Sequence, residues 1–82
     1  MKIEREGYTF FIKLTDTLRA EINCEKKGKE LKVTRSYTPE EYRGRGIATS
    51  IMKEVIKYAR QEKLTIIPDC EFAKNYCMKN KC

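Results

Sequence analysis

Hydrophobic and polar residues alternate along the first half of the chain, which predicts β-strands. The runs at residues 8–14 and 18–24 each place an apolar side chain at nearly every second position, the pattern of a strand with one buried face. A third strand is predicted over residues 30–38, with Arg35 falling among the apolar positions of its inner face. The charged residues 25–29 include a glycine and predict the turn between the second and third strands.

The apolar spacing becomes helical after residue 46. One stripe at i, i+3 and i+4 spacing comprises Ile47, Ala48, Ile51, Met52, Val55, Ile56 and Ala59. A short apolar strand over residues 64–67 and a second helix over residues 72–80 follow. We expect the strand at 64–67 to be buried on both faces and to run parallel to the strand at 30–38, because a helix connects the two.

These elements predict an α+β fold that ends in an α/β unit. We expect a mostly antiparallel sheet of about four or five strands, followed by a parallel βαβ unit and two helices in all. A chain of 82 residues suffices for one small hydrophobic core. A single domain over residues 1–82 is therefore expected.

Composition limits the function classes. The net charge of +6 suits a phosphate-rich partner such as a nucleotide cofactor or nucleic acid. The chain has no histidine and its four cysteines lack CxxC spacing, so no metal site is predicted. No run approaches the roughly 18 apolar residues of a membrane span, and no apolar signal segment is visible. We expect a cytoplasmic monomer or weak homodimer with reduced cysteines, Cys24 in the core, and a frayed tail at residues 79–82.

Residues 41–48 form a loop between a predicted strand and a predicted helix. Gly44 and Gly46 allow the backbone to approach a ligand closely. The amides of residues 43–48 can then point in one direction and continue into the open N–H groups of a helix N-terminus. Such an arrangement binds phosphate groups, and Arg43 and Arg45 add positive charge. The sequence therefore predicts a phosphate-binding loop.

The pattern Arg43-x-x-Gly46-x-Ala48 resembles motif A of the GNAT superfamily, the acetyl-CoA-dependent N-acetyltransferases. The match is closest to small GNAT-like proteins, in which a strand ending in Pro-x-Cys follows the helix. Here that motif is the segment 68–70, and a helix carrying Tyr76 comes after it. The resemblance covers about residues 31 to 80 and implies a reduced GNAT-like fold.

The resemblance implies an acetyl-CoA site between two parallel strands that splay apart. Backbone groups of the first of these strands would bind the pantetheine arm as an added strand, and the loop amides would bind the pyrophosphate. The implied cofactor-binding residues are Ser36, Tyr37, Thr38, Arg43, Gly44, Arg45, Gly46, Ile47, Ala48 and Thr49. The implied reaction transfers an acetyl group to an amine acceptor, which is a small molecule or a protein.

Two residues are candidates for the chemistry. Cys70 follows the splayed strand, where the resemblance places the thioester, and can accept the acetyl group, shuttle a proton or only line the site. Tyr76 lies on the last helix, where larger members of the superfamily carry a tyrosine acid, but it equally suits a core position. Without histidine, no general base stands out.

Two other functions remain open from the sequence. A non-catalytic module that binds CoA or acyl-CoA would need neither acid nor base. A basic nucleic-acid-binding domain fits the charge, although the exposed faces show no aromatic run of the kind that stacks bases. A dinucleotide-binding loop fits less well, because Thr49 stands where a third glycine is required.

Overall fold

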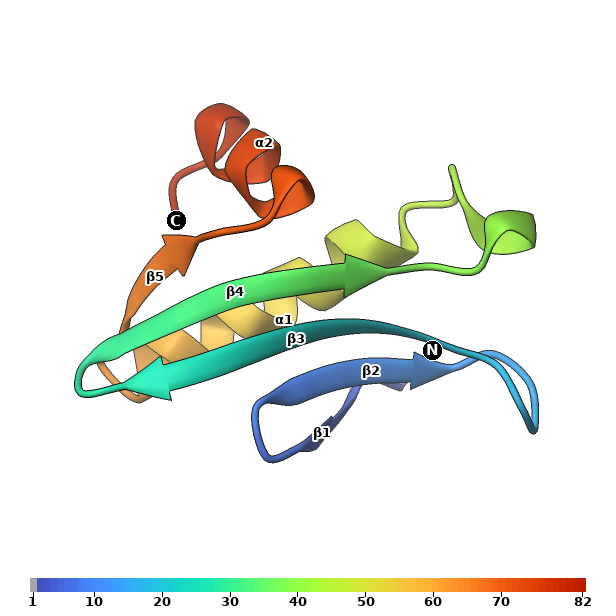
Figure 1. Ribbon diagram of the computed structural model, residues 1–82, viewed down its shortest axis with the longest axis horizontal. Helices are drawn as coiled ribbons and strands as arrows, with labels where there is room; N and C mark the ends of the chain where they lie inside the picture. The colour runs from blue at the N-terminus through green and yellow to red at the C-terminus, as the bar shows by residue number, and fades with distance from the viewer. Residues whose placement is uncertain (1) are drawn as a thin grey trace.

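The computed structural model describes residues 2–82 and contains one mixed sheet and two α-helices (Figure 1). The elements in chain order are β1 (Glu4–Glu6), β2 (Thr9–Lys13), β3 (Arg19–Lys27), β4 (Glu30–Tyr37), η1 (Glu40–Tyr42), α1 (Ile47–Gln61), β5 (Thr65–Pro68) and α2 (Glu71–Lys79). The strands lie side by side in the order β1-β2-β3-β4-β5. The first four pair antiparallel, and β5 pairs parallel with β4. The predicted α+β architecture with its parallel C-terminal unit is confirmed.

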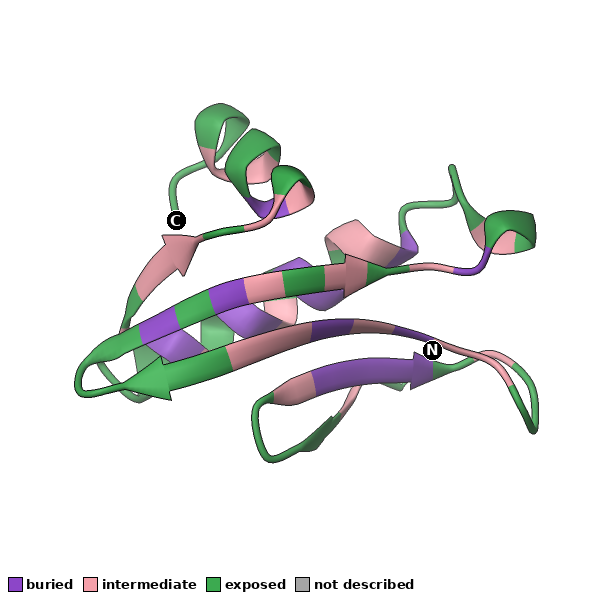
Figure 2. Cartoon of the chain, in the orientation of Figure 1, coloured by how far each residue is buried: buried purple, intermediate pink, exposed green. Residues whose placement is uncertain are grey.

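The core lies between α1 and one face of the sheet (Figures 1 and 2). The predicted apolar stripe of α1 is confirmed, because Ile51, Met52 and Val55 are fully buried. The sheet contributes alternate side chains of its central strands: Phe10, Ile12, Ala20, Ile22, Leu31 and Val33. Since burial of such side chains is the largest favourable contribution to folding, this interface fixes α1, and hence its N-terminus, against the sheet.

The turn between β3 and β4 is shorter than predicted. Residues 25–27 remain in β3, and only Gly28 and Lys29 form the turn. The expectation of a loop over 25–29 is therefore wrong. The register places Glu25 opposite Lys32 and Lys27 opposite Glu30, so opposite charges face each other across the hairpin and favour its extension.

A β-bulge in β4 corrects the expected position of Arg35. Asn23 pairs with Arg35, but the next residue of β3 pairs with Val33, so Thr34 is an extra residue in β4. The bulge reverses the alternation of side chains after Val33. Leu31 and Val33 consequently face α1, whereas Arg35 lies on the opposite face of the sheet, beside Asn23. The prediction that Arg35 shares the apolar face is wrong.

β5 is an edge strand that accompanies β4 along only half of its length. The pairing covers Glu30 to Val33 of β4, and the amide of Asp69 donates a last hydrogen bond to the Val33 carbonyl at 2.9 Å. Because β5 lies at the edge, its residues are half-buried or exposed, and the expected burial on both faces is wrong. Within residues 2–82, no strand pairs with the outer edge of β4 from Thr34 to Tyr37.

The C-terminal tail is held by a disulfide between Cys77 and Cys82, with 5.4 Å between their Cα atoms. The amide and the Nδ2 of Asn80 also donate hydrogen bonds to the Tyr76 carbonyl, at 2.9 and 3.1 Å. The expectations of a frayed tail and of uniformly reduced cysteines are therefore wrong. Neither helix in the described residues is long and apolar enough to cross a membrane.

We expect the disulfide to stabilise the fold. A cross-link that closes so short a loop should raise the free energy of unfolding by about 2 kcal/mol, because it limits the conformations of the unfolded chain. Urea unfolding of the oxidised protein and of Cys82→Ser measures the difference, with the reduced wild type as a second comparison. Reductant should leave the Cys82→Ser midpoint unchanged. Equal midpoints for the oxidised wild type and the variant would show that the pairing contributes nothing.

Candidate functional site

The loop between β4 and α1 is built on local backbone bonds. The amide of Tyr42 donates to the Pro39 carbonyl at 2.9 Å, and the amide of Arg43 donates to the Glu40 carbonyl at 3.2 Å. The Nε of Arg43 also donates to the carbonyl of Thr38 at 2.9 Å. This contact ties the start of the loop to the end of β4 and fixes the Arg43 side chain.

The glycines of the loop are required by backbone angles. Gly44 and Gly46 have φ angles of +78° and +77°, values that residues with a Cβ adopt only with strain. A Cβ added at either position would meet no atom within 4 Å. The glycines therefore set the path of the chain into α1, where Gly46 is the N-cap residue, and they leave open space above the loop.

The N-terminus of α1 presents unused hydrogen-bond donors. Its N-cap has no side chain that could accept a hydrogen bond, and its first turn contains no acidic residue. The first helical bond runs from the Ser50 amide to the Gly46 carbonyl at 3.0 Å. Within residues 2–82, the amides of residues 44–49 donate to no backbone carbonyl or side chain. Free amides at the positive end of a helix dipole favour an anion.

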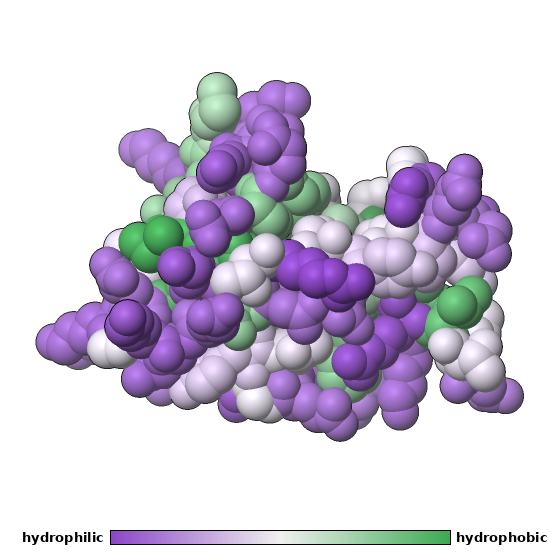
Figure 3. Space-filling view, in the orientation of Figure 1, coloured by the Kyte–Doolittle hydropathy of each residue, from purple (hydrophilic) through white to green (hydrophobic). Residues whose placement is uncertain are grey.

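A cleft of about 250 Å³ lies above these amides. It is lined by Thr38, Tyr42, Arg43, Gly44, Gly46, Ile47, Ala48, Thr49 and Phe72. A second cleft of about 330 Å³ continues from it, because Thr49 and Phe72 line both. The face in Figure 3 is hollowed between α2 and the loop that follows β4, and neutral and hydrophobic atoms line this hollow.

Seven of the ten cofactor-binding residues implied by the sequence line this cleft, and the other three lie elsewhere. Arg45 does not line it, since its guanidinium lies over the Tyr42 ring at 5.3 Å. Ser36 and Tyr37 lie on the last part of β4, outside the cleft. Phe72 is a wall residue of both clefts that the sequence analysis did not identify as part of the site. Its position in the first turn of α2, directly after the Pro-x-Cys segment, was the signal for its place beside the loop.

Residues 9–82 match the family of GCN5-related N-acetyltransferases. The chain belongs to this family. It is also similar to a solved structure, the solution NMR structure of a GCN5-like protein from Staphylococcus aureus. The two are 28% identical, the match covers 95% of this chain and 78% of the other, and the TM-score is 0.79. No curated protein matches the chain significantly.

In this member of the GCN5-related family, Cys70 is the N-cap residue of α2. The amide of Ala73 donates to its sulfur at 3.5 Å, which fixes the side chain in one orientation. Cys70 is half-buried and follows β5 directly beyond the point where β4 and β5 part. Cys70 therefore follows the end of β5 by two residues, as the sequence indicated, and its side chain packs against the core.

Two further residues bear on the chemistry: Tyr76, the other candidate from the sequence, and Cys24, the other reduced thiol. Tyr76 lines the second cleft, next to Thr49, and packs near Phe72 with 6.2 Å between the ring centroids. Cys24 packs half-buried against the core, as predicted. Burial, together with the charge of Cys70, raises the pKa of the Cys24 thiol to about 12. Cys24 is therefore protonated at neutral pH and is a poor nucleophile.

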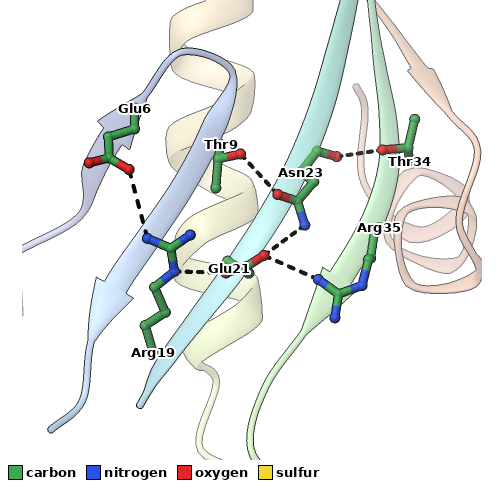
Figure 4. A network of polar contacts seen from close by, with 7 residues as sticks. All are labelled: Glu6, Thr9, Arg19, Glu21, Asn23, Thr34 and Arg35. Atoms are coloured by element: carbon green, nitrogen blue, oxygen red, sulfur yellow. Dashed lines mark hydrogen bonds and ion pairs between the residues drawn. The ribbon is translucent and has the colours of Figure 1, made fainter. Parts of the chain in front are cut away.

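The face of the sheet opposite α1 carries a polar network centred on Glu21 (Figure 4). Its carboxylate accepts hydrogen bonds from Arg19 Nε at 2.8 Å, Asn23 Nδ2 at 2.9 Å and Arg35 Nη1 at 3.1 Å. The Thr34 hydroxyl donates to the Asn23 carbonyl at 3.1 Å and so joins the bulge to the network. These contacts hold the bulged half of β4 against β3, where it borders the gap left by β5.

Opposing effects set the charge state of Glu21. Burial alone would raise the pKa of its carboxyl, but the hydrogen bonds from Asn23 and Arg19 and the charges of Arg19 and Arg35 lower it below the ordinary value. The carboxylate therefore stays ionised at neutral pH. It stabilises the folded state above the ordinary pKa of glutamate, and this stabilisation is lost as the pH falls through the lowered pKa.

We expect Glu21→Gln to reveal this charge. At pH 7 the variant should lose about 1 kcal/mol of unfolding free energy, the scale of partly exposed charge-assisted contacts. The difference from wild type should shrink as the pH falls below about 4. Urea unfolding at several pH values measures it, with exposed Glu62→Gln as the control that should show no such change. A loss of equal size at every pH would assign the effect to packing instead.

Proposed function

We propose that this chain binds acetyl-CoA and transfers its acetyl group to an amine acceptor. The main support for the proposal is the row of unused amides at residues 44–49, which follows the unpaired edge of β4 at residues 34–37. A pyrophosphate needs several convergent donors, and an extended pantetheine arm needs an unpaired strand edge. Both lie on one side of the molecule and adjoin the same loop.

In this assignment each part of the cofactor has its own residues. The amides of residues 44–49 and the hydroxyl of Thr49 bind the pyrophosphate, and Arg43, held by the Thr38 carbonyl, adds positive charge. Backbone groups of residues 36–38 bind the pantetheine arm. The second cleft, where Lys79 and Tyr76 are wall residues, receives the nucleotide end. Tyr76 is thereby assigned to binding, because it lines this cleft beside Thr49.

Cys70 is assigned the chemical role. Acetyl-CoA supplies an activated acetyl thioester. The Cys70 sulfur forms a bond to the acetyl carbon while the bond from that carbon to the CoA sulfur breaks, and the CoA sulfur takes up a proton. An amine that arrives neutral then attacks the acetyl group on Cys70, which releases the amide and returns the proton to the cysteine. The amide of Ala73 orients the sulfur for the first step.

Acetyl-CoA should raise the melting temperature of the wild type. A ligand at about 100 times its Kd adds about 2.7 kcal/mol of stability. Gly46→Glu should abolish the shift, because it places a negative charge among the loop amides. Gly28→Glu is the matched control: its φ of +60° gives a similar backbone penalty and it makes the same charge change, but it lies in the β3–β4 turn. It should lower the starting melting temperature yet keep the shift.

Either of two outcomes would refute the cofactor site. One is the absence of any shift at millimolar acetyl-CoA. The other is a shift that Gly28→Glu and Gly46→Glu lose to the same degree, since a general loss of structure would then explain both.

Acetyl-CoA should acetylate Cys70 and leave Cys24 unmodified. The raised pKa of Cys24 keeps its thiolate fraction negligible at pH 7. Peptide mass spectrometry after incubation with acetyl-CoA locates the modification, and Cys70→Ser should remove it without changing the thermal shift. Acetylation of both thiols would indicate random chemical transfer. Binding without acetylation of Cys70 would leave a module that holds acetyl-CoA but does not use this thiol.

A further inference from the structure

A groove of about 560 Å³ lies between α1 and the C-terminal part of α2. It contains no residue of the phosphate loop, but it shares Tyr76 and Asn80 with the second cleft. Four basic side chains line it: Lys53, Lys57, Arg60 and Lys81. Its apolar part consists of Ile56, which is almost fully buried, and the half-buried Tyr76. No acidic residue from the described part of the chain lines the groove.

The charges in this groove are uncompensated. Among residues 2–82, none of the four basic side chains takes part in an ion pair, whereas Arg19 and Arg35 on the opposite face of the sheet both pair with Glu21. Lys53, Lys57 and Arg60 follow one another at i, i+4 and i+7 and so share one face of α1. Like charges at this spacing destabilise a helix, so an anionic ligand would relieve their repulsion.

The groove is also preformed on its tail side. The disulfide at Cys77 and the two hydrogen bonds of Asn80 to the Tyr76 carbonyl hold the segment that carries Lys81. In Figure 1 the C-terminus accordingly lies beside α2 and β5. A ligand would therefore meet a fixed wall and would not have to order a loose tail, which lowers the entropic cost of binding.

We infer that this groove binds an acidic segment of a partner protein, in extended form, with one apolar side chain placed over Ile56 and Tyr76. Charge complementarity requires carboxylates or phosphates, and the apolar floor favours a peptide that carries an aliphatic side chain. The row from Lys53 to Arg60 is about 10 Å long, which matches about three extended residues. A single-stranded nucleic acid would need several stacking aromatics, and among the described residues that line the groove only Tyr76 is aromatic.

Fluorescence anisotropy with a labelled peptide, Asp-Glu-Asp-Leu-Glu-Asp-Glu, tests the proposal on the oxidised 82-residue chain. The triple variant Lys53→Glu, Lys57→Glu, Arg60→Glu should weaken binding by about tenfold or more, since three contacts become repulsive. Its matched control is Lys13→Glu, Lys26→Glu, Lys29→Glu. This control changes the net charge equally at exposed positions outside the groove and should weaken binding by about twofold at moderate salt.

A second peptide keeps the test independent of how the variants fold. Replacing the leucine by serine retains the charge but removes the apolar anchor, so it should bind the wild type several-fold more weakly. Equal binding of the two peptides, or equal losses in the two triple variants, would refute the groove in favour of general charge attraction. Tighter binding of an oligothymidine of the same charge would assign the surface to nucleic acid.

The cofactor proposal can be tested separately from the groove. The groove shares Tyr76 and Asn80 with the second cleft, so saturating acetyl-CoA should weaken peptide binding only slightly. The groove variant should keep the acetyl-CoA thermal shift. Full displacement of the peptide by acetyl-CoA would overturn the inference, because the groove would then belong to the cofactor site. The absence of an acetyl-CoA shift together with leucine-dependent peptide binding would refute the cofactor proposal and support the groove.

Discussion

The hydrogen bonds between β4 and β5 end at Val33, and the rest of the site depends on this early separation. At the next residue the bulge at Thr34 turns β4, while the chain after Pro68 bends away toward α2. The Glu21 network holds the bulged half of β4 on β3, so this half keeps its strand form without a second neighbour. The edge of β4 that is left open leads directly into the loop before α1. One irregularity in strand pairing therefore creates both the open edge and its alignment with the helix N-terminus.

The anion site and the hydrophobic core are built by the same helix. The buried stripe of α1 packs against the sheet, and this packing alone decides where the helix N-terminus points. Gly46 then allows the chain to enter the helix in a conformation that leaves its first amides without partners. Because no acidic side chain occupies the first turn, the positive end of the helix dipole has no neutralising carboxylate within that turn. The electrostatic preference for an anion thus follows from the packing of α1, from Gly46 at its N-cap and from the lack of an acidic residue in its first turn.

The sequence predicted the parts of this fold that follow from local pattern. The alternation in β2 and β3, the stripe of α1 and the parallel unit needed only periodicity and connection rules, and the loop was identified by its glycines. Most errors arose at positions whose structure depends on contacts with a neighbouring strand or helix. The position of Arg35 depends on pairing with Asn23, and the extension of β3 depends on charges facing it from β4. The edge position of β5 depends on the finished arrangement of the strands. The Cys77–Cys82 disulfide is local, since it joins residues five apart, and it was missed because reduced cysteines were expected throughout. The role of Phe72 as a wall residue likewise required the relative position of α1 and α2.

The two basic regions of the chain differ in how their charge is used. At the loop, Arg43 is held by the Thr38 carbonyl and Arg45 lies over an aromatic ring, so both side chains are ordered beside backbone donors. Such an arrangement suits a compact ligand with concentrated charge, because fixed donors lose little entropy on binding. In the α1–α2 groove the cations are exposed and carry flexible stems over an apolar floor. That combination suits carboxylates distributed along an extended peptide, since flexible lysines can adjust to each one. A net charge of +6 therefore acts through two surfaces of different chemistry, and only the first adjoins the open edge of β4.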